Sequence, residues 1–305
     1  MPHTSEIQLR DPYVLTDHEA GAYYLCGSTD TDIWKGEGTG FDVYRGTDLE
    51  QWEGPFPAFR PPSDFWSPGE YWAPEIHEHR GRYYLFATFG PGRHVERRGT
   101  AVLAADSPLG PFVPHSTDDA GQPAPVTPPE WECLDGTLHV DDDGAPWMVF
   151  CHEWVQIADG AICAVRLSED LSRAEGEPVR LFSASEAPWM EPLVTRKRGT
   201  GWITDGPFLH RTSEGELLML WASFRGGRYA QGLAVSASGT VTGPWRHEPE
   251  PLYEADGGHG MLFQTLPGAD GRSELMLTLH TPNRTPEERA VFIPVEENHG
   301  TLTLR

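Results

Sequence analysis

The chain has 305 residues, and its 46 Asp and Glu against 23 Lys and Arg give a formal net charge of −23 at pH 7. Such a charge repels phosphate backbones and anionic lipid headgroups, so we expect neither nucleic acid nor a membrane as partner. Eleven Trp residues and an aromatic content of 11% exclude a disordered chain. We expect one folded unit over residues 1–305, because single β architectures often exceed roughly 200 residues.

Pairs of strand-like segments joined by a polar turn recur along the whole chain. In each pair, branched and aromatic residues precede and follow a turn that contains Gly or an acid, which is typical of a β-hairpin. The five hairpins are PYVLTDHEAGAYYLCGS (12–28), PEIHEHRGRYYLFATFG (74–90), GTLHVDDDGAPWMVFCH (136–152), GPFLHRTSEGELLMLWAS (206–223) and GMLFQTLPGADGRSELMLTLHT (260–281).

A third strand-like segment follows each hairpin, and Gly-Pro pairs close several of these units. Units of four short strands per ~40–50 residues, plus insertions, are typical of β-propeller blades. No helical period is sustained along the chain. We therefore predict an all-β fold, a five-bladed β-propeller. The third strands are expected at 41–48, 100–107, 161–170, 231–238 and 290–297.

Acidic residues stand near the expected start of the inner strand in four of the five units. One acid at such a place usually caps a turn. Inner strands of a propeller line the axis, however, so four acids there converge on one hollow, where they repel each other and perturb each other's pKa. We therefore predict a central funnel-shaped active site built from Asp11, Glu75, Asp135, Asp205 and, in the fifth unit, His259.

Carboxyl groups that face each other across a pocket suit the hydrolysis of a glycosidic bond. One must be protonated to donate to the leaving oxygen, and another must be ionised to act on water or on the sugar. Different degrees of burial and different neighbouring charges separate the two pKa values.

At these residues the chain resembles glycoside hydrolase family 43, five-bladed propeller enzymes that act on arabinofuranosides and xylosides. RDPYVL (10–15) resembles the first-blade motif that carries the general base, which implies this role for Asp11. LDGTLHV (134–140) resembles the third-blade motif whose aspartate tunes the pKa of the acid and holds the sugar, here Asp135.

The fourth-blade motif of the family reads Glu-Gly-Pro and its glutamate is the general acid, whereas this chain reads TDGPFLHR (204–211). The resemblance therefore implies Asp205 as the acid, with a side chain one methylene shorter. An error of about 1 Å in position can cost roughly 100-fold in rate. Glu153, in FCHEWVQ (150–156), follows the next strand of the third blade and is the alternative proton donor.

Further residues are expected to contact the sugar. WAPEIH (72–77) resembles the second-blade WAPD motif with Glu in place of Asp, and its Trp either stacks on a sugar face or belongs to the core. ERAVFIPV (288–295) resembles the late strand of the family whose arginine reaches the sugar. The expected substrate-binding residues are Trp72, Glu75, His152, Glu153, Trp154 and Arg289.

GGHGML (257–262) resembles the fifth-blade motif in which a histidine faces the central channel, near a bound calcium or other ion. His259 is therefore the candidate metal residue. A Gly-flanked His is also common as a structural residue, and calcium prefers oxygen ligands. The chemistry itself requires no cofactor.

The four cysteines show no CxxC spacing, and the first residues, MPHTSEIQLRDPY, lack the pattern of a signal peptide. From these features we expect a cytoplasmic protein with reduced thiols.

The motifs together predict an inverting glycoside hydrolase that cleaves pentofuranosides, an exo-acting α-L-arabinofuranosidase whose partners are short oligosaccharides or glycosides. The change from Glu to Asp in the fourth blade supports a second hypothesis, a weakly active or non-hydrolytic sugar-binding propeller. A related furanosidase acting on fructosides, a β-xylosidase and an arabinanase are further candidates.

Overall fold

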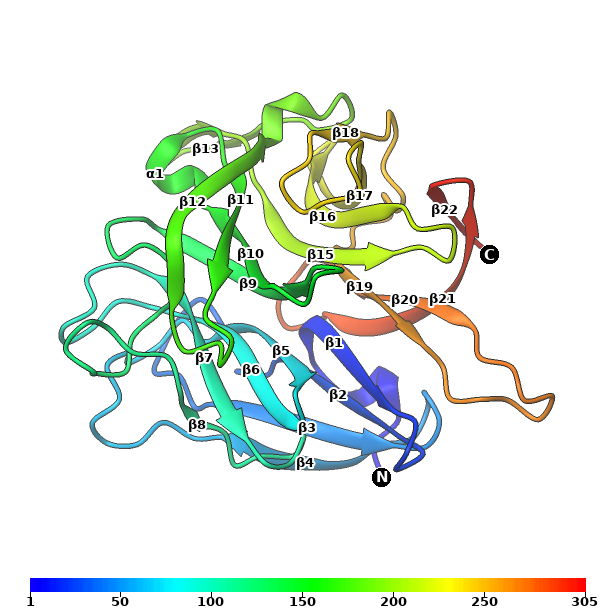
Figure 1. Cartoon of the computed structure of the whole chain (residues 1–305), viewed down its shortest axis with the longest axis horizontal. Coiled ribbons are helices and arrows are strands. Elements are labelled where there is room, and N and C mark those ends of the chain that lie inside the picture. Colours follow the sequence, from blue (N-terminus) through cyan, green and yellow to red (C-terminus); the bar gives the residue numbers. More distant parts are fainter.

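A computed structural model describes all 305 residues and contains five four-stranded antiparallel sheets around a central axis (Figure 1). Within each sheet the strands follow one another in chain order, each hydrogen-bonded to the next. The first strands of the sheets, β1, β5, β9, β15 and β19, contact one another in a closed ring around the axis. This arrangement confirms the predicted five-bladed β-propeller.

The blades have the following strands. Blade 1 contains β1 (Arg10–Asp17), β2 (Ala22–Ser28), β3 (Phe41–Gly46) and β4 (Glu53–Phe59). Blade 2 contains β5 (Trp72–His79), β6 (Arg82–Phe89), β7 (Gly99–Ala105) and β8 (Val113–Pro114). Blade 3 contains β9 (Cys133–Val140), β10 (Pro146–His152), β11 (Ala161–Leu167) and β12 (Ala174–Ser183).

The last two blades follow an insertion. Blade 4 contains β15 (Asp205–Arg211), β16 (Leu217–Arg225), β17 (Arg228–Ser236) and β18 (Trp245–His247). Blade 5 contains β19 (Gly258–Gln264), β20 (Leu275–Thr281), β21 (Arg289–Asn298) and β22 (Thr301–Leu304).

Few elements lie outside the blades. A small hairpin of β13 (Leu193–Thr195) and β14 (Gly199–Gly201) lies between blades 3 and 4, and the sequence reasoning did not predict it. The helical segments are η1 (Thr4–Glu6), α1 (Trp154–Ile157) and η2 (Ala184–Glu186), and none is long and apolar enough to cross a membrane.

The hydrophobic core lies between adjacent blades, where the faces of neighbouring sheets pack on each other. It consists of four clusters, and fully buried members such as Leu25, Phe86, Val149 and Leu220 come from second strands of different blades. Each fully buried Leu or Phe side chain contributes about 1.5–3 kcal/mol relative to an exposed one. All four cysteines are unpaired and buried in this interior.

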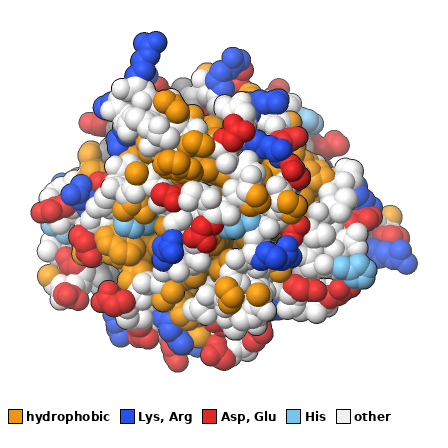
Figure 2. All heavy atoms as spheres, turned by 90° about the horizontal axis from the view of Figure 1, so that it is seen from above, with side chains coloured by type: hydrophobic (Ala, Val, Ile, Leu, Met, Phe, Trp, Pro, Cys, Tyr) orange, Lys and Arg blue, Asp and Glu red, His pale blue; other side chains and the backbone are white.

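Charged side chains do not gather into a single-sign patch on the face that Figure 2 shows. Acidic, basic and hydrophobic side chains are interspersed there. The net charge of −23 is therefore not concentrated on this face.

Every inner strand has a β-bulge near its start, where the register with the second strand shifts. A bulge interrupts the alternation of side chains, so that two consecutive residues can face the same side. A positive φ is unusual for residues other than Gly, Asn, Asp and His, and it often marks a functional region. The residues at the bulge with positive φ are Asp11 (53°), Ala73 (46°), Asp135 (56°), Gly206 (49°) and His259 (53°).

The bulges define which residues are equivalent between blades, and they correct the sequence alignment of the acids. Asp11, Asp135 and His259 occupy the same bulge position. Asp205, however, precedes this position by one residue, and Glu75 follows it by two residues. The four expected acids therefore do not occupy one equivalent position in the blades. They occupy three: the bulge itself, the residue before it and the second residue after it.

Candidate active site

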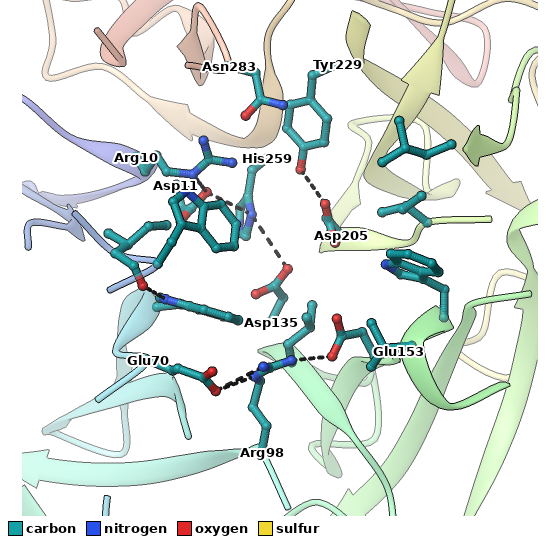
Figure 3. A pocket seen from close by; sticks show the side chains of 18 of the residues that line it. Arg10, Asp11, Glu70, Arg98, Asp135, Glu153, Asp205, Tyr229, His259 and Asn283 are labelled. Atoms are coloured by element: carbon teal, nitrogen blue, oxygen red, sulfur yellow. Dashed lines mark hydrogen bonds and ion pairs between the residues drawn. The ribbon is translucent and has the colours of Figure 1, made fainter. Parts of the chain in front are cut away.

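A cavity of about 600 Å³ opens where the inner strands begin, and 22 residues line it. Each of the five blades contributes residues from the start of its inner strand. Asp11, Asp135, Asp205 and His259 are among them, and Figure 3 shows their side chains pointing toward one another. The three predicted catalytic carboxyls, distant in the chain, thus share one hollow.

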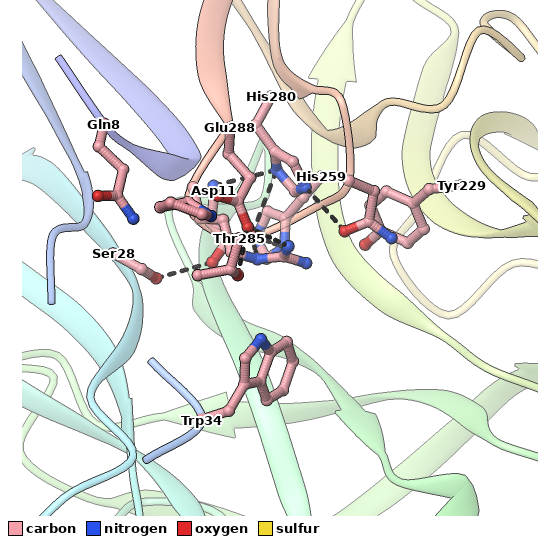
Figure 4. Close-up of polar contacts among 12 residues, drawn as sticks. Gln8, Asp11, Ser28, Trp34, Tyr229, His259, His280, Thr285 and Glu288 are labelled. Atoms are coloured by element: carbon pink, nitrogen blue, oxygen red, sulfur yellow. Dashed lines mark hydrogen bonds and ion pairs between the residues drawn. The ribbon is translucent and has the colours of Figure 1, made fainter. Parts of the chain in front are cut away.

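The carboxylate of Asp11 is surrounded by groups that stabilise its charged form (Figure 4). The Ser28 hydroxyl donates a hydrogen bond of 2.7 Å to Oδ2, and His259 Nδ1 lies 3.2 Å and Arg10 Nε 3.7 Å from Oδ1. Burial alone would raise the pKa of Asp11, but His259, Arg10 and Ser28 lower it to about 2. Asp11 is therefore ionised at neutral pH and can accept a proton.

His280 supports Asp11 from behind as a neutral ring. The backbone N–H of Asp11 donates to His280 Nδ1 at 3.2 Å, so this nitrogen acts as the acceptor and carries no proton. Burial lowers the pKa of His280 to about 3, with a further contribution from the charge of Arg10. The contact of 3.5 Å between His280 Nδ1 and Asp11 Oδ1 is thus not an ion pair at neutral pH.

Asp205 lies on the other side of the cavity in a different environment. Burial raises its pKa to about 7, Glu153 adds to the rise, and the hydrogen bond from Tyr229 opposes it. This bond joins Tyr229 Oη to Asp205 Oδ2 at 3.0 Å. An ionised Asp11 and a protonatable Asp205 therefore face each other across the cavity (Figure 3).

Asp135 lies between these two groups (Figure 3). Its Oδ2 accepts a hydrogen bond of 3.0 Å from the backbone N–H of Gly206, the residue after Asp205. A Cβ at Gly206 would lie 2.7 Å from the ring of His259, so only glycine fits there. Burial, followed by the charges of Asp205 and Asp11, raises the pKa of Asp135 well above its usual value. Asp135 thus fixes the backbone that carries Asp205.

Glu153 lines the same cavity but is held by an arginine. The guanidinium of Arg98 forms ion pairs with Glu153 and, at 2.9 Å, with Glu70, and it lies 4.5 Å above the ring of Trp72. Burial raises the pKa of Glu153 and Arg98 counteracts this rise. Trp72 is fixed in turn by a 2.8 Å hydrogen bond from its Nε1 to the carbonyl oxygen of Ile33. Arg98 therefore orders one wall of the cavity.

Comparison with known proteins agrees with this geometry. The family model described as glycosyl hydrolases family 43 matches residues 4–292. The chain belongs to this family. As a family 43 member it is a glycosidase, and the five-bladed propeller with a carboxyl-lined cavity is the structure that its sequence motifs predicted.

Two proteins similar to this family 43 chain are named as an arabinofuranosidase and a xylosidase/arabinosidase. It is 27% identical to the extracellular exo-α-(1→5)-L-arabinofuranosidase ArbA of Cellvibrio japonicus over 254 residues, which are 79% of this chain and 67% of the relative. It is 33% identical to xylosidase/arabinosidase 43A of Humicola insolens over 131 residues, 43% of this chain and 36% of that protein. Among solved structures, an endo-arabinase of Bacteroides thetaiotaomicron is 42% identical, with a TM-score of 0.87 and 99% coverage of both chains.

Three residues expected to bind substrate do not line the cavity of the family 43 chain. The ring of His152 stacks on Trp131 with centroids 4.2 Å apart, and its Nε2 lies 2.8 Å from Gln156 Oε1. Glu75 is buried outside the cavity lining, and its Oε2 accepts a 2.6 Å hydrogen bond from Thr137 Oγ1. The third is Arg289; the remaining expected residues, Trp72, Glu153 and Trp154, do line the cavity.

Arg289 holds the chain terminus rather than reaching the cavity. Its guanidinium donates to the carbonyl oxygens of Ser5, Pro286 and Glu288 at 2.7–3.0 Å. Arg10, which does line the cavity, comes from blade 1, and its NH1 lies 3.1 Å from Glu288 Oε1. The expectation that Arg289 reaches the sugar is therefore not met by its position.

Sequence reasoning missed several residues of the site, among them Arg10 and Tyr229. Strict alternation along a strand would place the neighbours Arg10 and Asp11 on opposite faces. The bulge at Asp11 brings both side chains to the cavity. Tyr229 begins the third strand of blade 4, and no motif marks it.

The side chains around His259 do not form a protein cage for a metal ion. No group of three or more His, Cys, Asp or Glu side chains has an arrangement that could hold one. The Nδ1 of His259 instead lies 3.2 Å from Asp11 and 3.7 Å from Asp135, and burial lowers the pKa of its ring. The residues present therefore give no basis for a chemical step through a metal.

Tyr229→Phe tests the hydrogen bond that restrains Asp205. The ring, which is stacked 5.5 Å from His280, remains, but the donor to Asp205 is lost. Because that bond lowers the pKa of Asp205, its loss raises this pKa, and the fall in activity at high pH should move to higher pH. With Asp205 as the acid that its motif implies, kcat should fall about 10-fold, since this side chain loses its fixed orientation. A pH–rate profile with an unchanged upper limb would contradict this role.

Proposed function

We propose that this family 43 glycosidase is an inverting, exo-acting α-L-arabinofuranosidase of short oligosaccharides. The observation that carries the proposal is the pair of opposed carboxyl groups with different proton affinities, Asp11 with a pKa of about 2 and Asp205 with a pKa of about 7. A glycosidase needs one ionised and one protonated carboxyl group.

The two groups act in one concerted displacement. Asp11 accepts a proton from a water molecule, whose oxygen forms a bond to the anomeric carbon while the glycosidic bond breaks. Asp205 donates its proton to the departing oxygen. An inverting pair needs carboxyl groups about 6.5–9.5 Å apart to admit that water. The position of Asp11 and Asp205 on opposite sides of the cavity supports this arrangement.

The choice of sugar rests on the relatives. The name of ArbA gives exo cleavage of α-(1→5)-linked L-arabinofuranose. The solved structure with 42% identity is that of an endo-arabinase, which makes an endo-acting arabinanase the second candidate. Both candidates act on arabinofuranosyl linkages and differ in the products that they release.

The products of linear arabino-oligosaccharides distinguish the two candidates. We expect arabinose alone as the first product, in the anomeric form opposite to that of the substrate, as followed by proton NMR. Early release of arabinobiose and arabinotriose would favour the endo-acting candidate, and retention of the anomeric form would overturn the inverting mechanism. Matched activity on nitrophenyl xylosides would overturn the choice of arabinose.

Trp34 provides a further test of where the oligosaccharide lies. This side chain lines the cavity and is 57% exposed, and its ring packs edge-on to Trp72 at 5.3 Å. An exposed Trp ring at a sugar site offers an apolar face for stacking. We expect Trp34→Ala to raise KM for arabinotriose about 10-fold. Because the ring also packs on Trp72, Tm is measured beside KM to detect a loss of stability, and an unchanged KM would exclude the stacking.

A further inference from the structure

Three consecutive cations of the chain have no partner. The hairpin of β13 and β14 carries Arg196, Lys197 and Arg198 at its turn. No carboxylate lies within ion-pair distance of these three side chains, although the protein has 46 acidic residues and most of its 23 cations are paired. Each of the three side chains is exposed.

Two of these cations face the active-site cavity. Lys197 and Arg198 line it together with Leu193 from the same hairpin, whereas Arg196 does not. The charge of Arg198 also acts on the carboxyl group of Glu153. The hairpin thus extends the cavity of blades 1 to 5 with positive charge at its mouth.

Residues at the base of the β13–β14 hairpin pack on and hydrogen-bond to α1 and the segment after it. These contacts fix the position of the turn relative to the cavity. A side chain at Gly201 would overlap the ring of Trp154, which shows that β14 packs directly on this residue of α1. The backbone N–H of Trp202 donates to the carbonyl oxygen of Ala158 at 2.9 Å, and that of Gly160 donates to the carbonyl oxygen of Trp202 at 2.8 Å.

The other charges of the cavity are already balanced. Arg10 is paired with Glu288 and Asp11, and Arg98 with Glu70 and Glu153. Burial raises the pKa of both Asp135 and Asp205, which favours their neutral forms. Acids elsewhere on the surface are screened beyond about 8 Å at physiological salt. An anionic group at the mouth therefore meets mainly the two free cations.

We propose that Lys197 and Arg198 bind the carboxylate of a uronic acid that adjoins the hydrolysed sugar, so that the substrate is an acidic oligosaccharide. The guanidinium of arginine matches a carboxylate with two parallel hydrogen bonds, and lysine adds a point charge. The inference rests on the proposed hydrolysis of arabinofuranosides and specifies what the arabinose is attached to.

Binding of pectic oligosaccharides that carry arabinose tests this inference. The same oligosaccharides are used before and after chemical reduction of their carboxyl groups, which converts each uronic acid into a neutral hexose of the same shape. With the Asp11→Asn protein, which should not turn them over, calorimetry should give about 5- to 10-fold tighter binding of the acidic form. This ratio should fall toward 1 in 0.5 M NaCl (on the order of a 4 Å Debye length).

Variants of the hairpin attribute the effect to its residues. In Lys197→Gln/Arg198→Gln the ratio should fall to about 1, while in Arg196→Gln, a cation of the same turn that does not line the cavity, it should stay at about 5 to 10. Equal binding of acidic and reduced oligosaccharides, or equal ratios in the two variants, would overturn the inference.

The hydrolytic proposal is judged separately, by the activity of the wild-type protein on arabinofuranosides. Activity with no preference for the carboxylate refutes only the role of the hairpin. A preference for the carboxylate without activity refutes only the hydrolytic proposal.

Discussion

Asp11→Asn should lower kcat for 4-nitrophenyl α-L-arabinofuranoside by about 10³- to 10⁴-fold, because the amide cannot take a proton from water. The fold should remain, since Asn tolerates the positive φ of 53° at this bulge and keeps the shape of Asp. The amide can also still accept the hydrogen bond from Ser28. Initial rates measured beside circular dichroism and Tm therefore separate loss of chemistry from loss of structure.

The matched control is Asp270→Asn, an exposed aspartate in the turn between β19 and β20, far from the cavity lining. It should keep full activity. If Asp11→Asn retains more than about a tenth of the wild-type rate with every substrate, Asp11 is not the base. An absence of activity in the wild type would favour the sugar-binding propeller that the shortened acid suggested.

The five-bladed fold was accessible from sequence because each hairpin carries its own local signal. In PYVLTDHEAGAYYLCGS, for example, two runs that strongly favour strands flank a polar turn with Gly21, and the structure has β1 and β2 there. The third strands, such as 290–297 within β21, follow in the same way. Because the same local pattern occurs in five units, a wrong boundary at any single strand does not change the predicted fold.

The register of the acids was less accessible, because it depends on a backbone irregularity. Alignment on acidic residues paired Asp11 with Glu75 and Asp205, whereas the bulge pairs it with Ala73 and Gly206. Ala73 and Gly206 are not acidic, so their residue type does not mark the bulge position in the sequence. The family resemblance correctly directed attention to Asp11, Asp135 and Asp205 as one cluster, but it could not show that Glu75 lies outside the cavity lining.

Contacts between residues that are distant in the sequence were the least predictable part of the site. Arg98 reaches Glu153 across 55 positions of sequence, and Tyr229 reaches Asp205 from the third strand of blade 4. No periodic pattern encodes such a pairing, since it depends on how two loops approach in space. The hairpin of β13 and β14 likewise lacks the alternating pattern of a blade strand.

The environments of Asp205 and Glu153 support the proposal that Asp205 is the acid. Arg98 forms a direct ion pair with Glu153, which counteracts the rise that burial causes in the pKa of this carboxyl group. Asp205 has no cation in ion-pair contact, and Tyr229 can remain its hydrogen-bond partner whether or not Asp205 is protonated. The shorter side chain is thus placed where its proton is retained until neutral pH.

Asp205→Asn should therefore lower kcat about 10²- to 10⁴-fold for arabino-oligosaccharides, whose leaving oxygen must be protonated. For 2,4-dinitrophenyl arabinofuranoside the loss should be within about 10-fold, because this leaving group departs as a stable anion without a proton. Glu153→Gln should show no such difference between the two substrates. A difference that appears with Glu153→Gln and is absent with Asp205→Asn would assign the acid to Glu153.

The pH dependence gives the same assignment by an independent route. Asp205 must be protonated to act, so kcat/KM of the wild type should fall as pH rises through about 7. Asp11 must be ionised, and its pKa of about 2 places the loss on the acidic side far below the working range. With arabino-oligosaccharides, whose leaving oxygen needs a proton, the residual activity of Asp205→Asn should no longer fall near pH 7, because the group whose deprotonation causes the fall is absent. If the fall persists in that variant, another group carries the proton, and Asp205 serves only to shape the cavity.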